Sequence, residues 1–441
     1  MNAPRRRFGF WLATALVVGN IIGSAIFMLP AGLAPFGWNA VSAWLVTFVG
    51  ALCLAWVFAE LARHLPTAGG SYGFMRLGVG DSAAFLGAWG YLVSLWAANA
   101  AITIGGISYL TRLVPGLDGS PTASTIMALA AIWLFTWINL RGLQTTGGVQ
   151  LVTSIVKLVP FVAVIGLAIW RLAASRGAVL PPMHASSFTF AGASGAVGLT
   201  LYAMLGLESA TVPADAVENP GHIVPLATMV GTGLSAVVSI IATCAVALML
   251  PVDVVTASKA PISDFIAVSW GADAGILVAL GAVVSCFGCL NGWLLVGGEL
   301  PVAMAEAGTL PRWFGQRNAA GAPAQSLVLG AAVTSLLTLM AYTKQGVAAY
   351  NFMILIATAT NLVMYFLCTI AVVRFMRDGR VPRSAGLIAS ALVALVFAAW
   401  AMYGSGAESL AWGSVLIAAG WPVYLVARRV AARAVELAAA R

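Results

Sequence analysis

The sequence has very little charge for its length. Only 8% of its 441 residues are Asp, Glu, Lys or Arg, whereas 61% are hydrophobic. Soluble domains contain about 25% charged and roughly 45–50% apolar residues, so a soluble core of ordinary size has no room for this much apolar surface. The composition therefore excludes a soluble globular protein and predicts an integral membrane protein.

Residues that catalyse reactions or hold metals are also scarce. The three histidines, His64, His184 and His222, all fall outside the apolar segments. No apolar segment pairs a nucleophile with a base or contains a metal-ligating cluster. Cys286 and Cys289 have CxxC spacing, but no histidine or further cysteine lies near them in the sequence, which favours small packing residues over a metal or redox site. We expect no enzyme activity, no metal and no cofactor.

Long apolar runs occupy most of the chain. At about 20 residues per crossing, the chain has room for about twelve membrane spans. The arginine-rich start also resembles a secretory signal peptide, but the first apolar run continues to Pro30. We therefore predict one all-α membrane domain over residues 1–441, with spans near 9–34, 39–62, 83–113, 122–140, 147–170, 188–213, 224–250, 265–305 (including a short external helix), 325–342, 348–373, 385–403 and 409–427.

Positive charge is concentrated in alternate loops, and this predicts the orientation. Lys and Arg accumulate in cytoplasmic loops, so the net charge of +8 reflects topology and attraction to anionic lipid rather than binding to nucleic acid. Both termini are predicted in the cytoplasm of a multi-pass inner-membrane protein. The cytoplasmic residues are Arg5, Arg6, Arg7, Arg63, Arg76, Arg141, Arg312, Arg317, Arg374, Arg377, Arg380, Arg383, Arg428, Arg429, Arg433 and Arg441, against Arg112, Arg171, Arg176, Lys259 and Lys344 outside.

The first predicted span is interrupted near its middle by small and polar residues. Gly19, Asn20, Gly23 and Ser24 break an apolar run that ends at Pro30. A broken helix is tolerated in a membrane only where it lines a cavity or a binding site. The freed N–H groups near Ser24 and Ala25 suit a carboxylate. Close helix packing through small residues is the alternative interpretation.

A second interruption falls in the sixth predicted span, at Ala203-Met204-Leu205-Gly206-Leu207-Glu208. Carbonyls near Tyr202 and Leu205, with that of Ile21, would accept hydrogen bonds from an ammonium group. Two broken helices in corresponding positions of two halves are typical of a transporter's substrate site. Because five spans is an odd number, the two halves must have opposite orientation, over residues 1–170 and 188–374, with 385–427 outside the repeat.

Two ionisable residues fall inside predicted spans, where such residues are usually functional. Glu208 lies in the second interruption, and a carboxyl buried there would bind a proton at physiological or mildly acid pH. A structural hydrogen bond is the alternative. Lys157 lies in the middle of span five. Its ammonium would stand where a sodium-coupled carrier holds Na⁺, which argues against sodium coupling, unless the side chain snorkels to the interface.

Two further residues are candidate ligand contacts. Trp293 follows Gly292, which leaves room for a ligand against the indole, and a tryptophan face is a favourable partner for a guanidinium or ammonium group. Most tryptophans in such proteins are packing residues or interfacial anchors. Asn99, in span three, would cap a polar end of a ligand or join two helices.

These segments resemble the amino acid–polyamine–organocation permeases, and within them the bacterial arginine/agmatine antiporters. The similarity is collinear over nearly the whole chain. It includes Gly19 through Pro30, the loop from Pro66 to Tyr72, residues 206–210, Asn219-Pro220 and Gly292-Trp293. The resemblance implies a LeuT-type fold with a five-plus-five inverted repeat and two accessory helices, with helices 1 and 6 discontinuous, often as a homodimer.

The resemblance also implies roles for individual residues. Ser24 and Ala25 would hold the carboxylate, and the carbonyls of Ile21, Tyr202 and Leu205 would hold the α-amino group. Trp293 would stack on the guanidinium, with Asn20, Ser94, Leu95 and Asn99 nearby, and Tyr91, Glu208 and Tyr365 would form the gate on the cytoplasmic side.

Some positions depart from the antiporter pattern. Tyr202 stands where the antiporters have tryptophan, Ala357 where they have serine, and Ala25 where they have glycine. Lys157 has no counterpart there, although several proton-coupled or exchanging permeases in the wider family carry a lysine at this position. These departures leave the site for the amino acid backbone intact and weaken the assignment of arginine as the substrate.

The sequence thus predicts an amino acid exchanger that works by alternating access, taking a cationic amino acid such as arginine against its amine, such as agmatine. A proton-coupled permease for neutral amino acids is the alternative. A membrane-embedded enzyme lacks a catalytic cluster, and a channel lacks a visible filter motif. The expected partners are small amino acid and amine substrates and membrane lipid.

Overall fold

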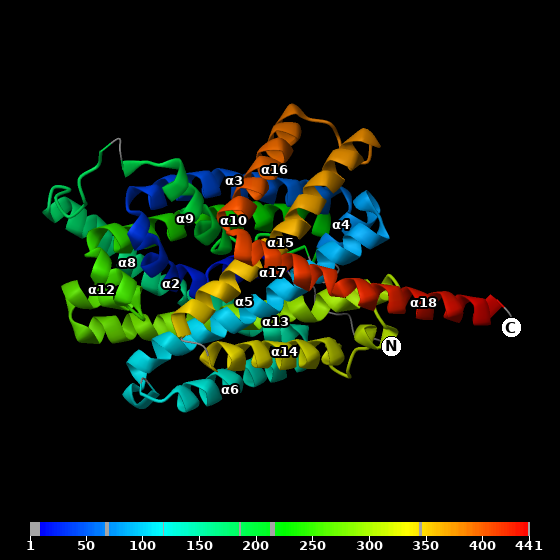
Figure 1. Cartoon of the computed structure of the whole chain (residues 1–441), viewed down its shortest axis with the longest axis horizontal. Helices are drawn as coiled ribbons and strands as arrows, with labels where there is room; N and C mark the ends of the chain where they lie inside the picture. Colours follow the sequence, from blue (N-terminus) through cyan, green and yellow to red (C-terminus); the bar gives the residue numbers. More distant parts are fainter. Residues whose placement is uncertain are drawn as a thin grey trace.

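The computed structural model of this chain is a bundle of helices (Figure 1). It describes residues 9–66, 70–117, 119–184, 187–211, 217–343 and 346–439, without the side chains of 343, 346–349, 351 and 431–439. Arg5, Arg6, Arg7, Lys344, Arg441 and parts of the loops 65–72 and 214–220 lie outside the described residues.

The helices follow one another with short connections. In chain order they are α1 (Phe10–Ile21), α2 (Ser24–Leu33), α3 (Trp38–His64), α4 (Gly70–Val79), α5 (Asp81–Leu113), α6 (Pro121–Leu140), α7 (Leu143–Val156), α8 (Leu158–Ala174), α9 (Phe190–Tyr202), α10 (Pro220–Met249), α11 (Val252–Ala257), α12 (Pro261–Trp270), α13 (Ala272–Glu306), α14 (Ala324–Thr343), α15 (Gly346–Arg377), α16 (Ala385–Gly404), α17 (Ala407–Ala418) and α18 (Gly420–Ala439).

The predicted membrane architecture is confirmed at the level of an all-α, multi-pass protein. Within the described residues, eleven helical segments are long and apolar enough to cross a membrane, and the first of them contains both α1 and α2. The span predicted at 188–213 is represented by the shorter apolar helix α9. Helices such as α6 and α14 run along the long axis of the bundle, α15 and α16 are steeply inclined to them, and α4 and α12 lie at opposite ends (Figure 1).

Several helix ends are set by local sequence. Ser120, Thr189 and Ser384 each accept a hydrogen bond at the first turn of α6, α9 and α16, which satisfies an otherwise free backbone N–H group. Proline at the first position starts α6 and α10, where its missing N–H group is not needed.

The centre of the bundle is formed by α5 and α13, the two longest helices that the structure describes (Figure 1). Small residues let neighbouring helices approach them, since membrane helices associate by close packing rather than by a hydrophobic force. A Cβ atom on Gly105 of α5 would lie 2.7 Å from the Ser24 Cβ atom, and one on Gly281 of α13 would overlap Pro160. The first broken helix can therefore sit against α5, and α8 can sit against α13.

Three features differ from the sequence-based prediction. The loop predicted after span two turns into helix α4 at Gly70, and α18 continues to Ala439, well beyond the predicted end at 427. Span five is two helices, α7 and α8, which meet at Lys157. The hydropathy of an apolar run gives its length but carries no information on a one-residue turn within it.

Candidate functional site

The first helix breaks where the sequence predicts it. Helix α1 ends at Ile21, and α2 begins at Ser24, with Ile22 and Gly23 in extended conformation between them. No side chain caps the α2 N-terminus. Its first backbone N–H groups have no partner within the helix, and they carry the positive end of the helix dipole. This end of α2 can therefore receive a carboxylate.

The carbonyl groups at the end of α1 are mostly occupied. The Lys157 ammonium donates to the carbonyls of Gly19, at 2.7 Å, and Ile22, at 2.9 Å. The Asn20 carbonyl accepts from the Trp293 indole N–H at 3.1 Å and from the Cys289 thiol at 3.2 Å. Among the residues that the structure describes, the Ile21 carbonyl has no such donor, which leaves it available to a ligand.

Lys157 does not reach an interface, because its side chain is fully buried. Its ammonium instead lies against the end of α1, where it donates to two main-chain carbonyls.

The second interruption follows α9 directly. After Tyr202 the chain forms turns from Ala203 to Thr211 instead of continuing as a helix. Gly206 has φ +110°, a conformation that other residues rarely adopt. A Cβ atom there would lie 3.1 Å from both Asn20 Cβ and Trp293 Cζ2. Glycine at 206 thus lets the second break approach the first.

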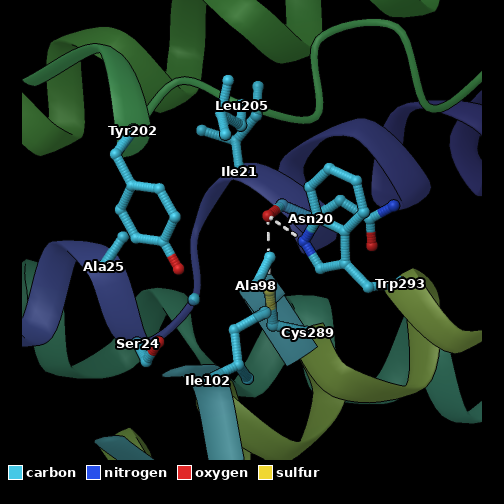
Figure 2. A pocket seen from close by; sticks show the side chains of 11 residues that line it. Asn20, Ile21, Ser24, Ala25, Ala98, Ile102, Tyr202, Leu205, Cys289 and Trp293 are labelled. Atoms are coloured by element: carbon cyan, nitrogen blue, oxygen red, sulfur yellow. Dashed lines mark hydrogen bonds between the residues drawn. The ribbon is translucent and has the colours of Figure 1, made fainter. Parts of the chain in front are cut away.

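A small cavity of about 20 Å³ lies between the two breaks. In Figure 2, Tyr202 and Leu205 reach it from the second break, with Ser24 and Ala25 of α2 on the other side. Ser24 is fully buried, and Tyr202 and Trp293 are 6% and 4% exposed. The residues that line the cavity are Asn20, Ile21, Gly23, Ser24, Ala25, Ala98, Ile102, Tyr202, Leu205, Cys289 and Trp293.

Most of the predicted substrate residues meet at this cavity, but four do not line it. Ser94 donates to the carbonyl of Ala357 at 2.8 Å, so this pair joins α5 to α15. Leu95 and Asn99 are also buried in α5 away from the lining. The Asn20 carboxamide points away from the cavity, toward Gly292 (Figure 2), so the Asn20 carbonyl is what faces the Trp293 indole.

Three lining residues were missed by sequence reasoning. Ala98 and Ile102 lie one turn apart on α5, and Gly105 continues the same face against Ser24. Cys289 lies one turn before Trp293 on α13. Helical spacing from Trp293 would have found Cys289, since residues four apart share a face. The α5 face carries only apolar or small side chains and gives no chemical signal.

The three predicted gate residues also come together. The Glu208 carboxylate accepts hydrogen bonds from the hydroxyl groups of Tyr91, at 2.6 Å, and Tyr365, at 2.5 Å. All three side chains are fully buried. Nearby, the Tyr72 hydroxyl is hydrogen-bonded to Thr309 at 2.8 Å. This cluster ties α5, α15 and the second break together on the α4 side of the cavity.

Among the described residues, no three His, Cys, Asp or Glu side chains come together. The cysteines are free thiols, and that of Cys289 donates to the Asn20 carbonyl. The site contains groups suited to binding a ligand. The α2 N-terminus can bind an anion, a free carbonyl oxygen can accept from an ammonium group, and the Trp293 indole lies beside both.

Comparisons with known proteins find relatives over nearly the whole chain. A family model described as amino acid permease matches residues 8–426. The putrescine transporter PotE of Escherichia coli is 32% identical over 429 residues, which is 96% of each chain. A cadaverine/lysine antiporter of Escherichia coli is 31% identical over 420 residues, which is 92% of this chain and 91% of that protein. These relatives are transporters and not enzymes.

The fold is also found in a solved structure. The crystal structure of MhsT in complex with L-phenylalanine matches with a TM-score of 0.66 at 14% identity, covering 92% of this chain and all of that one. The likeness is to a LeuT-like fold, which is the fold class that the family resemblance implies.

Proposed function

We propose, for a chain that belongs to the amino acid permease family, that it exchanges a cationic amino acid for a decarboxylated amine by alternating access. The observation that carries this proposal is the pairing of the uncapped α2 N-terminus with the free Ile21 carbonyl at one small cavity. The helix N-terminus at Ser24 and Ala25 binds the carboxylate, and carbonyl groups at Ile21, Tyr202 and Leu205 bind the α-amino group.

The pair of substrates follows from the site and from the relatives. The Trp293 indole can contact a side-chain cation of the substrate. Ala357 stands where the arginine/agmatine antiporters have serine, so it supplies no hydroxyl group to a guanidinium. The names of the relatives refer to putrescine, cadaverine and lysine. There are therefore three candidate pairs of substrates. They are arginine with agmatine, lysine with cadaverine, and putrescine with the amino acid from which it is formed. Exchange of an amino acid of charge +1 for an amine of charge +2 exports one positive charge, and decarboxylation in the cytoplasm consumes one proton.

The proposed architecture is an inverted repeat. Residues 1–170 and 188–374 form the two halves, each beginning with a broken helix, and residues 385–427 form two accessory helices. The breaks after Ile21 and Tyr202 support this assignment, since such helices meet at the repeat interface of known carriers. The proposed location is the bacterial inner membrane with both termini in the cytoplasm, and the resemblance to the permeases extends the proposal to a homodimer.

A proton-coupled permease for neutral amino acids is the second candidate. It is favoured by the buried Lys157 ammonium and the buried Glu208 carboxylate, because ionisable groups inside a membrane protein often carry protons. Uptake driven by a pH gradient into vesicles without internal substrate would support this function over obligatory exchange.

A counterflow assay tests the proposal. Purified protein in liposomes loaded with unlabelled agmatine, cadaverine or putrescine is given labelled arginine or lysine outside. We expect at least one loaded amine to accelerate uptake well above that of empty liposomes. Equal uptake with and without every internal amine would contradict exchange.

Replacing Trp293 should separate cationic from neutral substrates. A cation–π contact contributes about 0.5–2 kcal/mol, so Trp293→Leu should weaken arginine or lysine binding roughly 2- to 30-fold. Small neutral amino acids should be affected much less. Trp293→Phe is the matched control, because it also loses the indole N–H bond to the Asn20 carbonyl but keeps an aromatic face. Equal losses for both substrate classes, measured by calorimetry, would remove the cation–π argument.

Replacing Glu208 should change the pH profile of transport. The carboxylate accepts from two tyrosine hydroxyls, whereas a protonated carboxyl or an amide has one acceptor oxygen beside its donor. Because the amide resembles the protonated carboxyl, the transport rate of Glu208→Gln should be independent of pH and equal to the rate of the wild type at acid pH. Initial rates measured from pH 5 to 8 test this, and an unchanged pH dependence would rule out Glu208 as the sensor.

A further inference from the structure

The buried face of α7 is polar, although the helix lies in a membrane protein. Its buried residues are Thr146, Gly147, Gln150 and Ser154, and Lys157 follows at the same spacing. The opposite face exposes Val152 and Ile155 at 62% and 63%. These polar residues are three or four positions apart, so their side chains lie along one face of the helix. Polar groups placed inside a membrane protein usually serve a function.

The polar face continues into neighbouring helices. The Asn291 amide of α13 donates to the Gln150 side-chain oxygen at 3.4 Å and to the Thr146 carbonyl at 3.1 Å. The Asn139 amide of α6 donates to the Asn291 side-chain oxygen at 3.1 Å. These groups lead from the middle of α7 to the turn between α6 and α7, where Arg141 and Gln144 are exposed.

Several amide atoms along this line have unused hydrogen-bonding capacity. Both polar atoms of the Asn20 carboxamide, the Gln150 nitrogen and the Asn139 oxygen have no partner among the described residues. Their side chains belong to residues that are 2%, 1% and 2% exposed. Buried polar atoms without protein partners are where proteins bind ordered water.

Two glycines keep this region open for the amides. A Cβ atom on Gly292 would overlap the Asn20 side-chain oxygen and lie 2.9 Å from the Gln150 amide atoms. A Cβ atom on Gly19 would lie 2.7 Å from the Ser154 hydroxyl and would overlap the Gln150 nitrogen. The Asn20 and Gln150 carboxamides therefore face each other across space that only glycine leaves free.

Lys157 stands at the inner end of this line. Its ammonium has three donors, of which two bind the Gly19 and Ile22 carbonyls. Helices α1 and α2 contain no acidic or basic residue. The titratable groups that face the ammonium are the Cys286 and Cys289 thiols of α13, and no ion pair to it is found in the described part of the chain. The third N–H group remains for a further acceptor.

We propose that the polar face of α7, with Asn20, Asn291 and Asn139, is a hydrated proton path between the Lys157 ammonium and the turn joining α6 to α7, on the side of Asn20 that faces away from the substrate cavity. One N–H bond of the ammonium breaks and one O–H bond forms on a bound water molecule, which leaves a neutral amine. The reverse transfer restores the ammonium, so no further reactant is needed. The inference deepens the second candidate function, proton-coupled transport, and rests on it.

Removing the Gln150 amide tests the path. Wild type and Gln150→Leu are placed in liposomes containing a pH-sensitive dye, and substrate is added outside to liposomes without internal substrate. We expect the substrate-driven proton flux of Gln150→Leu to fall roughly tenfold or more, the scale of a lost proton-transfer group. Counterflow of labelled against unlabelled lysine or arginine moves no net proton and should stay near the wild-type rate.

Three controls keep the result interpretable. Thr338→Val removes a buried hydroxyl group that bonds only within α14 and should change neither rate. Gln150→Glu keeps a group that binds water and should retain the proton flux. Ser154→Ala removes a single hydroxyl from the same face and should give a smaller selective loss, even where Gln150→Leu does not fold.

The possible outcomes separate this inference from the transport proposal. Equal loss of proton flux and counterflow in Gln150→Leu and Ser154→Ala, with a lowered melting temperature, would indicate a structural role and overturn the path. Counterflow by the wild type without any substrate-driven proton flux would also overturn it, while leaving the exchanger intact. Absence of both counterflow and substrate binding in the wild type would instead contradict the proposed function.

Discussion

Gly23→Ala should abolish most transport, and Cys289→Ala should restore part of it. The Gly23 backbone has φ −138°, which alanine adopts without strain. The obstacle is steric, because the added Cβ atom would overlap the Cys289 sulfur and lie 2.8 Å from its Cβ atom. Overpacking of this kind costs about 1–3 kcal/mol, which corresponds to a loss of roughly 5- to 150-fold in affinity or rate.

The double variant makes this prediction specific to the contact. Removing the Cys289 sulfur takes away the nearest obstacle, so Gly23→Ala/Cys289→Ala should transport faster than Gly23→Ala alone. Initial uptake rates of the wild type, both single variants and the double variant give the coupling directly. Additive losses would show that the position of α2 against α13 does not control the site.

Gly206→Ala should also reduce transport strongly, for a conformational reason. A residue with a Cβ atom pays about 1–2 kcal/mol at positive φ, and the Cβ atom would press on both Asn20 and Trp293. We expect initial uptake to fall roughly 5- to 30-fold or more. The two breaks could then no longer approach as closely as the cavity requires.

A second glycine supplies the control. Gly271, between α12 and α13, has φ +89°, and a Cβ atom added to it would have nothing within 4 Å. Gly271→Ala should therefore carry the same backbone strain and lower the melting temperature, with the apparent affinity for substrate unchanged. If Gly206→Ala takes up and binds substrate as well as the wild type does, the close approach at this glycine is not needed.

Much of the fold could be predicted because the bilayer restricts the choices. A long apolar run must be a helix, and polar interruptions must face a cavity, so the breaks at Gly23 and Gly206 were visible in the sequence. The turn at Lys157 was not, since one residue of altered backbone leaves no trace in hydropathy. The extent of α18 was also missed, because its last turns are charged and its helical character does not depend on crossing the membrane.

The parts of the candidate site that consist of main-chain groups could be predicted from the sequence. The parts that depend on where a side chain points were harder to predict. Ser24, Ala25 and Ile21 meet at the cavity because the break itself exposes their backbone groups. Asn20 was expected beside the ligand, yet its carboxamide turns toward Gly292. Ser94 instead bonds the Ala357 carbonyl. Which face of a buried helix meets a cavity depends on the rotation of that helix, and that rotation is set by its neighbours.

In the proposed site, the two breaks together recognise an amino acid. An uncapped helix N-terminus and a carbonyl without a partner lie on opposite sides of the first break, and Tyr202 and Leu205 of the second break line the same cavity. A carboxylate and an ammonium group on one carbon atom match this arrangement. The cavity is much smaller than a basic amino acid, so Tyr202, Leu205 or Trp293 must move when substrate enters.

A structure of the protein with bound lysine or arginine tests this account most directly. We expect the substrate carboxylate to lie within hydrogen-bonding distance of the Ser24 and Ala25 backbone N–H groups, and the α-ammonium group to contact the Ile21 carbonyl. An amino acid bound elsewhere, with the start of α2 unliganded, would contradict the proposed site.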